Sequence, residues 1–359
     1  MKKVLALLLI FAMAFSLVAC SGGDGGSSST PSSTPSSSGG DASSSTPSND
    51  KSYTLKFAHI RPEGSPSDIA FNAFKDEVEE KSGGSIKIDI YPANQLGDYT
   101  VVQERVSLGD VEMLCGSVGT SVNKNFGTMN LPYLASNWTQ AKEIFYSTEW
   151  LGQQYKAWFA DMDIEMLCAY PLYYGAVITK DAVKDPTTVN VSHNIKIRVP
   201  PQKVYEVTAT MLGYIATPIA FADTFTSMQT GIVDGSIGAG AEGYYGNFKD
   251  LAKHLYAYND HFEMWYMIIN KPLFDGMSDA QKTVLQEAAM NCENNRWEIA
   301  EAETGEYEGL LEEAGCEIHH FTDDQLAVFA TAGKEQVWPA VREDYDVDVF
   351  DELIGQFGD

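Results

Sequence analysis

The sequence predicts an α/β fold of two lobes whose parallel strands face one ligand cleft. Strand and helix patterns alternate in two separate stretches, 53–117 and 164–216, as expected for βαβ units. A long helical pattern follows at 279–311, and a helix of that length can lie across both lobes. Because ligands of open α/β sheets bind at the carboxyl ends of the strands, two facing lobes predict a cleft that closes on a small molecule.

The first stretch opens with a strand at 53–58, where polar and apolar residues alternate. Ala70, Phe74 and Val78 then fall at helical spacing, and the helix should end at Ser82-Gly83-Gly84. The elements expected next are a strand at 86–90, a helix at about 100–108 and a short strand at 111–115.

The second stretch repeats this order. Its strands are expected at 164–168, 176–179, 195–199 and 214–216, with a helix at about 204–212. Pro200-Pro201 should end the third of these strands, because proline cannot donate to a ladder.

The N-terminal residues predict export and lipidation. Lys2 and Lys3 precede an apolar run at 4–15, and Leu17-Val-Ala leads directly to Cys20. This pattern resembles the bacterial lipobox, so we expect residues 1–19 to be removed and Cys20 to carry a lipid that anchors the chain to the membrane. The alternative is an ordinary signal peptide with an incidental cysteine. Residues 20–51 are almost wholly Ser, Gly, Pro and Thr, which predicts a disordered tether.

Composition excludes several partners. A net charge of −26, with 50 acidic residues, argues against nucleic acid and against direct docking on anionic lipid. An anionic ligand would therefore need a local positive pocket, since nearby groups decide affinity in a buried site. The spacing of the later cysteines fits no zinc or redox motif, so we expect no metal and no cofactor. It leaves open whether Cys292 and Cys316 form a disulfide.

An exported hydrolase and a structural lipoprotein are the rival classes. The sequence contains neither Gly-x-Ser-x-Gly nor His-Glu-x-x-His, and His319-His320 are adjacent rather than one helical turn apart. The segment 238–243 matches the dinucleotide fingerprint, but Asp234-Gly-Ser precedes it and a turn-like Gly-Tyr-Tyr-Gly follows. We therefore expect a hinge or close-approach loop there.

Motifs along the whole body carry a family likeness. The most telling are Ile195-Lys-Ile-Arg-Val-Pro200, Thr217-Pro-Ile-Ala-Phe221 and Met228-Gln-Thr-Gly-Ile-Val-Asp-Gly235, and weaker ones lie at 55–59, 65–66, 90–92, 95–98 and 130–134. In order and spacing they resemble the solute receptors of tripartite ATP-independent periplasmic (TRAP) transporters, the DctP family.

The resemblance implies a periplasmic-binding-protein-like fold: two α/β domains around a ligand cleft, joined by crossing strands and a long spanning helix. Domain I would comprise 52–175 plus about 263–302, and domain II 176–262 plus about 303–359. It also implies an extracytoplasmic receptor, not an enzyme, that closes on one small organic acid. The receptor would deliver this ligand to the small and large membrane permease subunits for uptake driven by an ion gradient.

The resemblance also nominates site residues. Arg198 stands where the family grips its ligand, and its planar donor fork suits a carboxylate; from the residue alone, a strand-end ion pair is the alternative. Phe221 stands where the family tends to place an aromatic against the ligand, and Tyr173 or Tyr174 would add another wall, with core packing as the alternative. Ser117 either donates to the ligand or caps the next helix.

The sequence departs from the family at two points. Gly238 replaces an asparagine that helps to hold the ligand, and the arginine that many members carry is missing from 174–178. We therefore expect a monocarboxylate rather than a dicarboxylate, with an uncharged sugar or polyol as the alternative. Glu242 lies close by, either binding a hydroxyl or amine or standing as a surface carboxylate.

Overall fold

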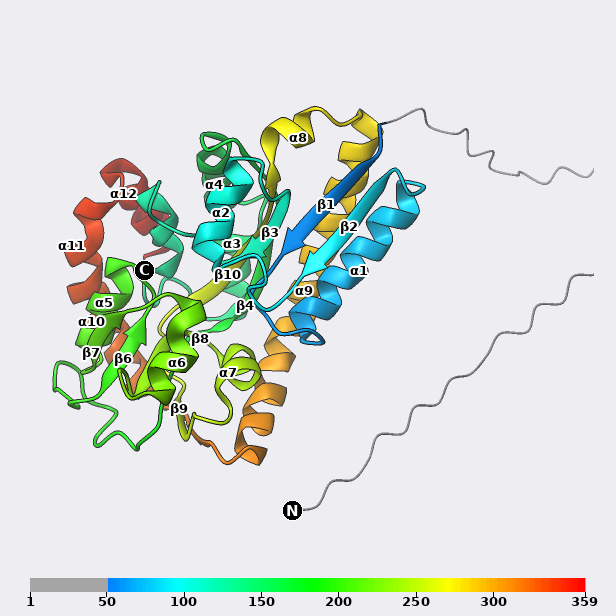
Figure 1. The fold of residues 1–359 in the computed structure, drawn as a ribbon. Coiled ribbons are helices and arrows are strands. Elements are labelled where there is room, and N and C mark those ends of the chain that lie inside the picture. The colour runs from blue at the N-terminus through cyan, green and yellow to red at the C-terminus, as the bar shows by residue number, and fades with distance from the viewer. Residues whose placement is uncertain (1–50, 359) are drawn as a thin grey trace, which may run out of the picture. The chain divides into compact units, whose positions relative to one another are not determined.

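The computed structural model describes residues 51–358. The expected export signal, Cys20 and the tether up to residue 50 lie outside the described residues. The described part of the chain forms two β-sheets with helices packed around them (Figure 1). This arrangement confirms the predicted α/β class.

The first sheet has the strand order β2-β1-β3-β10-β4. Its members are β1 (Tyr53–Ala58), β2 (Ile86–Tyr91), β3 (Met113–Gly116), β4 (Ile164–Tyr174) and β10 (Phe262–Asn270). β1 pairs in parallel with β2 and β3, whereas β10 runs antiparallel to both β3 and β4. The outer helices are α1 (Pro66–Lys81) next to β2 and α2 (Tyr99–Ser107) next to β3.

Helix α1 shows how local sequence sets these elements. Ser65 caps it by accepting a hydrogen bond from the Asp68 backbone N–H at 3.2 Å, and Pro66 occupies the first turn, where no donor is needed. The helix ends where Gly83 and Gly84 adopt positive φ angles of 60° and 78°. Phe71, Phe74 and Val78 then cover the sheet from one face of the helix.

The second sheet has the order β11-β9-β5-β8-β6-β7. Its strands are β5 (Ala176–Thr179), β6 (Lys196–Val199), β7 (Ile215–Pro218), β8 (Gly235–Ala239), β9 (His254–Tyr256) and β11 (Glu317–His319). β6 is parallel to β7 and β8, while β5 is antiparallel to β8 and β9. The helices that follow β6, β7 and β8 are α5 (Lys203–Met211), α6 (Thr224–Gln229) and α7 (Ala241–Phe248).

Two strand connections cross between the sheets side by side, from β4 into β5 and from β9 into β10, and the chain crosses a third time between β10 and β11. Gly175 lies in the first crossing, and its N–H bonds the His261 carbonyl in the second at 2.8 Å. A Cβ at Gly175 would lie 2.2 Å from the His261 ring, so only glycine lets the two crossings pass this closely.

Helix α9 (Asp279–Glu313) is the predicted spanning helix. A capping box between Ser278 and Gln281 starts it, and its 35 residues extend about 52 Å. It packs against β4 of the first sheet and against α7 and β11 of the second, so it braces both halves. None of the helices among residues 51–358 is long and apolar enough to cross a membrane.

The C-terminal helices follow β11: α10 (Asp323–Ala332), α11 (Trp338–Val341) and α12 (Val347–Phe357). They touch both halves of the molecule. Trp338 Nε1 donates to the Pro132 carbonyl at 2.9 Å, beside the 3₁₀ helix η1 (Lys124–Asn130), while α11 packs on α5.

Three local expectations were wrong or incomplete. The sheets are mixed rather than parallel, because each crossing brings in a strand of opposite direction. The segment 238–243 is no loop: it runs from the end of β8 into α7. Third, the disulfide that the sequence left open is not formed: Cys292 and Cys316 are free and buried, as are the cysteines at 115 and 168.

Candidate ligand-binding site

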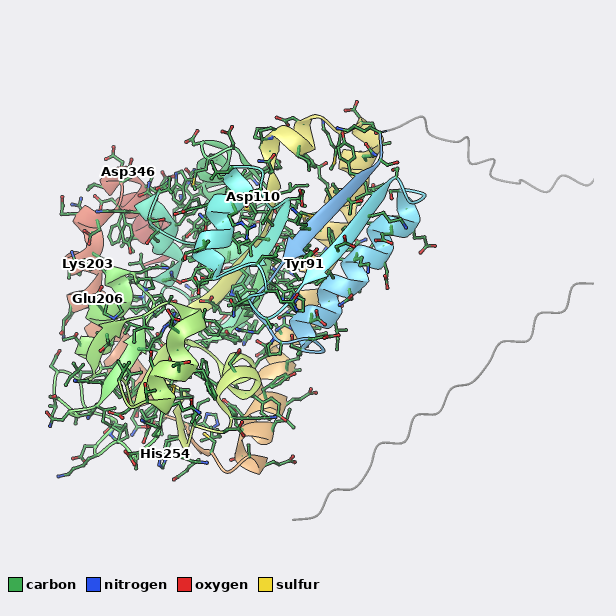
Figure 2. All side chains as sticks on the ribbon, viewed as in Figure 1. Tyr91, Asp110, Lys203, Glu206, His254 and Asp346 are labelled. Atoms are coloured by element: carbon green, nitrogen blue, oxygen red, sulfur yellow. The ribbon has the colours of Figure 1, made fainter. Side chains whose placement is uncertain are left out.

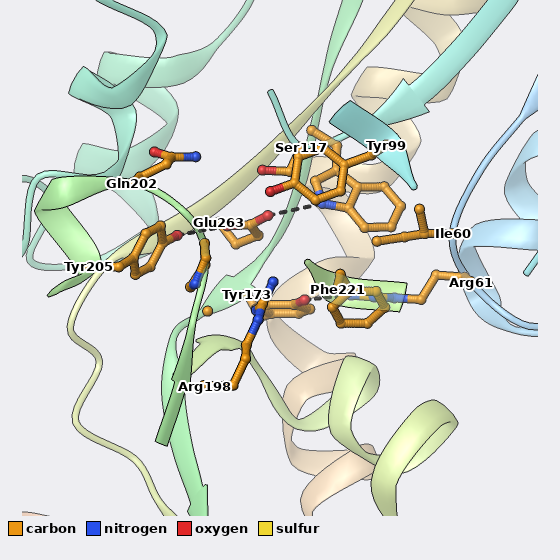
Figure 3. A pocket seen from close by; sticks show the side chains of 13 residues that line it. Ile60, Arg61, Tyr99, Ser117, Tyr173, Arg198, Gln202, Tyr205, Phe221 and Glu263 are labelled. Carbon is orange, nitrogen blue, oxygen red and sulfur yellow. Dashed lines mark hydrogen bonds between the residues drawn. The ribbon is translucent and has the colours of Figure 1, made fainter. Parts of the chain in front are cut away.

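One cavity is lined by residues attached to both sheets (Figure 3). It has about 350 Å³ of atom-free space, part of which is open to solvent, and its walls lie close together. The first sheet and its loops contribute Ile60, Arg61, Tyr99, Ser117, Tyr173, Glu263 and Trp265. The second contributes Arg198, Pro200, Gln202, Tyr205, Phe221 and Gly238.

Arg198 lies on β6, one residue before the strand ends, and its side chain enters this cavity. It is only 2% exposed. Its Nε donates to the Ile219 carbonyl at 2.8 Å and its Nη1 to the Ile237 carbonyl at 3.3 Å. The guanidinium also lies 5.7 Å from the centre of the Phe221 ring, so backbone and aromatic contacts fix its position.

No carboxylate within residues 51–358 forms an ion pair with Arg198. Burial lowers its pKa, and the acidic group that acts on it, Asp98, is engaged elsewhere, accepting from Thr100 and from the Ala222 N–H. Arginine nevertheless stays charged in proteins. A buried guanidinium without a counter-charge is costly, so Arg198 is a candidate anion-binding group.

Arg61, which sequence reasoning missed, is a second buried guanidinium in the cavity wall. It follows β1, and its Nε donates to Glu242 at 2.8 Å while its Nη2 donates to the Tyr173 hydroxyl. Burial is the largest single effect and opposes its charge, but Glu242, with Tyr173 and Glu263 acting in the same direction, outweighs it and raises the pKa of Arg61. The sequence did contain a signal for Arg61 as a site residue, since it lies just beyond the carboxyl end of a parallel strand, where ligands bind.

Glu242 is therefore neither a cavity residue nor a surface carboxylate. It is 5% exposed and sits at the start of α7, where its charge is matched by Arg61. A Cβ at Gly243 would lie 2.8 Å from Arg61 Nη2, so the guanidinium fills the space above this helix N-terminus. No room remains there for the pyrophosphate that a dinucleotide fingerprint would hold.

A second set of charges lies at the start of β10. His261 Nδ1 is 2.7 Å from Asp260 Oδ2, and its Nε2 is 3.4 Å from Glu263 Oε2. Burial opposes protonation of His261, but the Asp260 carboxylate and then Glu263 raise its pKa to about 10. Glu263 also accepts from Trp265 Nε1 at 3.0 Å. One imidazolium is thus shared by two carboxylates.

Asn130 joins two polar residues of the cavity wall, Gln202 and Tyr205. Its Nδ2 donates to Gln202 Oε1 at 2.9 Å, and its Oδ1 accepts from the Tyr205 hydroxyl at 3.1 Å. Ser117 follows β3 and faces the cavity. It caps no helix, because η1 begins with Asn123 as its cap, so the capping alternative for Ser117 is wrong.

The remaining nominated residues separate into two groups. Phe221 and Tyr173 line the cavity, and Gly238 lines it with φ +94° and a Cβ position 2.7 Å from Pro200 Cγ, where no side chain fits. Tyr174 does not line it. Successive residues on a strand face opposite sides, and Tyr174 packs instead edge-on against Trp138, with its hydroxyl 3.4 Å from the Ala135 carbonyl.

Comparison with known proteins identifies relatives of the same fold and the family to which the chain belongs. The chain is 22% identical over 289 residues to the C4-dicarboxylate-binding periplasmic protein DctP of Rhodobacter capsulatus, covering 79% of this chain and 85% of that protein. It is 25% identical over 318 residues to the sialic acid-binding periplasmic protein SiaP of Vibrio cholerae, covering 84% and 90%.

Two solved structures superpose closely. A TRAP periplasmic solute binding protein from Haemophilus influenzae with bound L-gulonate gives a TM-score of 0.77 at 18% identity, over 85% of this chain and 99% of that one. DctP7 of Bordetella pertussis, an extracytoplasmic receptor binding pyroglutamic acid, gives 0.75 at 16% identity, also over 85% and 99%. The profile of bacterial extracellular solute-binding protein family 7 matches residues 57–344, so the chain belongs to that family, the DctP receptors of TRAP transporters.

Proposed function

We propose that this receptor captures a small monocarboxylate, whose carboxylate group is held by Arg198. The observation that carries the proposal is a buried guanidinium that lines the cavity and lacks a carboxylate partner within residues 51–358. A ligand carboxylate would supply the missing counter-charge and accept from the guanidinium edge that the two backbone carbonyls leave free.

Membership of a solute-binding family makes the chain an extracytoplasmic receptor and not an enzyme. The relatives support the ligand class: gulonate and pyroglutamate, bound by two proteins of the same fold, each carry a single carboxylate.

The second guanidinium does not argue for a dicarboxylate. Arg61 already has the Glu242 carboxylate at 2.8 Å and the Tyr173 hydroxyl as acceptors. A second ligand carboxylate would have to displace a buried, well-formed ion pair, and breaking such a pair is strongly unfavourable. Arg61 therefore adds a second guanidinium to the cavity wall but no charge that is free for a ligand.

The remaining steps of transport follow from the family. We propose that the receptor is anchored through a lipid on Cys20 and delivers its ligand to TRAP permease subunits in the same membrane. Substitution Cys20→Ala should release the protein from the membrane fraction and abolish incorporation of a radiolabelled fatty acid. Persistent labelling of the variant would contradict the anchor.

Thermal unfolding against a library of organic acids, sugars, polyols and amino acids tests the ligand class. A ligand at a hundred times its Kd adds about 2.7 kcal/mol to stability. Hits that carry one carboxylate and disappear in Arg198→Ala would support the proposal. Hits confined to uncharged sugars or polyols would contradict it while leaving the receptor assignment intact.

A further inference from the structure

We propose that the ligand is a zwitterion, a small carboxylate that also carries a protonated amine, and that Glu263 binds the amine while Arg198 binds the carboxylate. This rests on the proposed function and extends it from the charge at one end of the ligand to the charge at the other. Both side chains line the same cavity from opposite sheets and form no ion pair with each other.

Some of the buried charges around the cavity cancel one another. Arg61 and Glu242 form a buried pair at 2.8 Å and contribute no net charge. His261 carries one positive charge against two carboxylates, and it lies nearer Asp260, at 2.7 Å, than Glu263, at 3.4 Å. The cavity wall is therefore left with an excess negative charge at Glu263.

Glu263 has acceptor capacity to spare. It is 3% exposed, and its Oε1 is taken by the Trp265 indole at 3.0 Å. Its Oε2 has only two long contacts, 3.4 Å to His261 and 3.5 Å to the Tyr205 hydroxyl. An ionised carboxylate can accept about four hydrogen bonds, so Oε2 can take a short, charge-assisted bond from an ammonium group.

The positive end of the proposed site is Arg198, whose guanidinium lies among backbone carbonyls and beside the Phe221 ring. Its charge is not balanced by a carboxylate of residues 51–358. A simple monocarboxylate would neutralise Arg198 but leave Glu263 buried with half a counter-ion. A dicarboxylate would place a second anion beside Glu263, and such a like-charge contact is strongly unfavourable. A zwitterion neutralises both Arg198 and Glu263, so the cavity selects against ligands of net charge −2.

The experiment compares ligands that differ only at the amine. Isothermal titration calorimetry of the purified wild-type protein would use amino acids, their 2-hydroxy analogues and the unsubstituted acids, together with matched dicarboxylates. We expect the amine-bearing member of the best-bound series to bind at least tenfold more tightly than its hydroxy or unsubstituted analogue. Equal or tighter binding of the analogue would overturn the inference without any variant.

The variant Glu263→Gln keeps an acceptor for Trp265 and removes the charge. It should weaken the amine-bearing ligand at least tenfold and leave the unsubstituted acid within threefold. If Glu263→Gln does not fold, Glu263→Asp tests the same bond. Retained affinity in Arg198→Ala would refute the proposed function itself, whereas loss there with no effect at Glu263 would refute only the zwitterion.

A second inference stands on a different part of the molecule. His254 on β9 and Glu317 and His319 on the adjacent strand β11 bring their ligand atoms within 4.8 Å of one another. His254 pairs with Glu317 in the parallel register, and Glu317 and His319, two residues apart, share a face of β11. His254 lies at the edge of the molecule shown in Figure 2. We infer that these three residues bind a divalent transition-metal ion such as Zn²⁺.

The distances suit a tetrahedral ion. His254 Nδ1 and His319 Nε2 are 3.1 Å apart, and the Glu317 oxygens lie 3.5 and 3.9 Å from the two rings. Two ring nitrogens at zinc–nitrogen distances of about 2.1 Å would be about 3.4 Å apart in tetrahedral geometry. Three protein ligands leave one position for water.

Calorimetric titration of EDTA-treated, untagged protein with ZnCl₂ tests this site. We expect one equivalent to bind and the unfolding temperature to rise, because the ion joins two strands. Both effects should vanish in His254→Ala and in His319→Gln and persist in His320→Ala, a matched control whose exposed ring pairs with Glu308 instead. Zinc binding that survives both first variants, or that is absent from the wild type, would overturn the assignment.

Discussion

Replacing Arg198 by alanine is the most direct test of the site. In the structure the guanidinium is buried, bonded to two backbone carbonyls and free of any carboxylate partner among residues 51–358. Truncating one partner of a buried, charge-assisted pair costs roughly 2 to 5 kcal/mol of binding free energy. That range corresponds to a loss of affinity between about thirtyfold and several thousandfold.

The same variant should change folding stability far less than affinity. Removing the guanidinium leaves the Ile219 and Ile237 carbonyls without their donors, which costs about 1 to 3 kcal/mol for each unsatisfied group. It also removes a buried charge without a counter-ion, which relieves a penalty of similar size. The opposing changes should leave the unfolding free energy of the ligand-free protein within about 2 kcal/mol of wild type.

Calorimetric titration measures affinity and chemical denaturation measures stability in the two variants Arg198→Ala and Arg198→Lys. The lysine variant keeps the charge but loses the donor fork, so its affinity should fall between those of wild type and alanine. An alanine variant that binds the carboxylate ligand within threefold of wild type would refute the reasoning. So would a lysine variant that is weaker than alanine while equally well folded.

Further predictions concern the surrounding charges and glycines. Glu242→Gln should destabilise the fold by about 3 to 5 kcal/mol and, by freeing Arg61, improve binding of a dicarboxylate relative to its monocarboxylate by tenfold or more in calorimetry. The pKa of His261 is raised to about 10 from 6.5, so its stabilisation is complete below pH 6.5 and is lost as pH rises towards 10; denaturation at pH 6, 8 and 9.5 should show falling stability, and His261→Gln a flatter profile. Gly238→Ala, at φ +94° beside Pro200, should cost about 1 to 3 kcal/mol in denaturation and weaken ligand binding. Because no carboxylate of residues 51–358 balances the charge of buried Arg198, the ligand-free protein should be more open in solution. X-ray scattering should show the radius of gyration fall on adding ligand; equal radii would contradict this.

The sequence predicts the elements whose signals are local. The alternation at 53–58 and 86–90 gives β1 and β2 within a residue or two, and the stop at Gly83 gives the end of α1. Strand β10 offers no such signal, because all nine of its residues are buried and no period of two survives. Its antiparallel direction follows from the second crossing between the sheets, which is a tertiary feature.

The site could be predicted in the same uneven way. Arg198 is recognisable because a family motif contains it and a strand ends beside it. Arg61 obeys the same strand-end rule but lies outside the telling motifs, and its neutralisation by Glu242, 181 residues away, cannot be read from the chain. The resemblance did not decide which of the adjacent tyrosines at 173 and 174 would face the cavity; in the structure Tyr173 lines it, and Tyr174 lies on the other side of β4.

Glu263 stands out in the sequence, but the sequence alone does not tell whether it is paired within the protein or available to a ligand. A single carboxylate inside the apolar run Phe262-Glu-Met-Trp-Tyr-Met-Ile-Ile269 must be paired or functional, since an isolated buried charge is too costly. Which of the two applies depends on His261, whose one positive charge is divided unequally between Asp260 and Glu263. The net charge of −26 is fixed by composition, but the charge that a ligand meets is fixed by which buried groups cancel. Ligand selectivity in this receptor is therefore a property of tertiary pairing, and a substitution far from the cavity that alters one pair can change it.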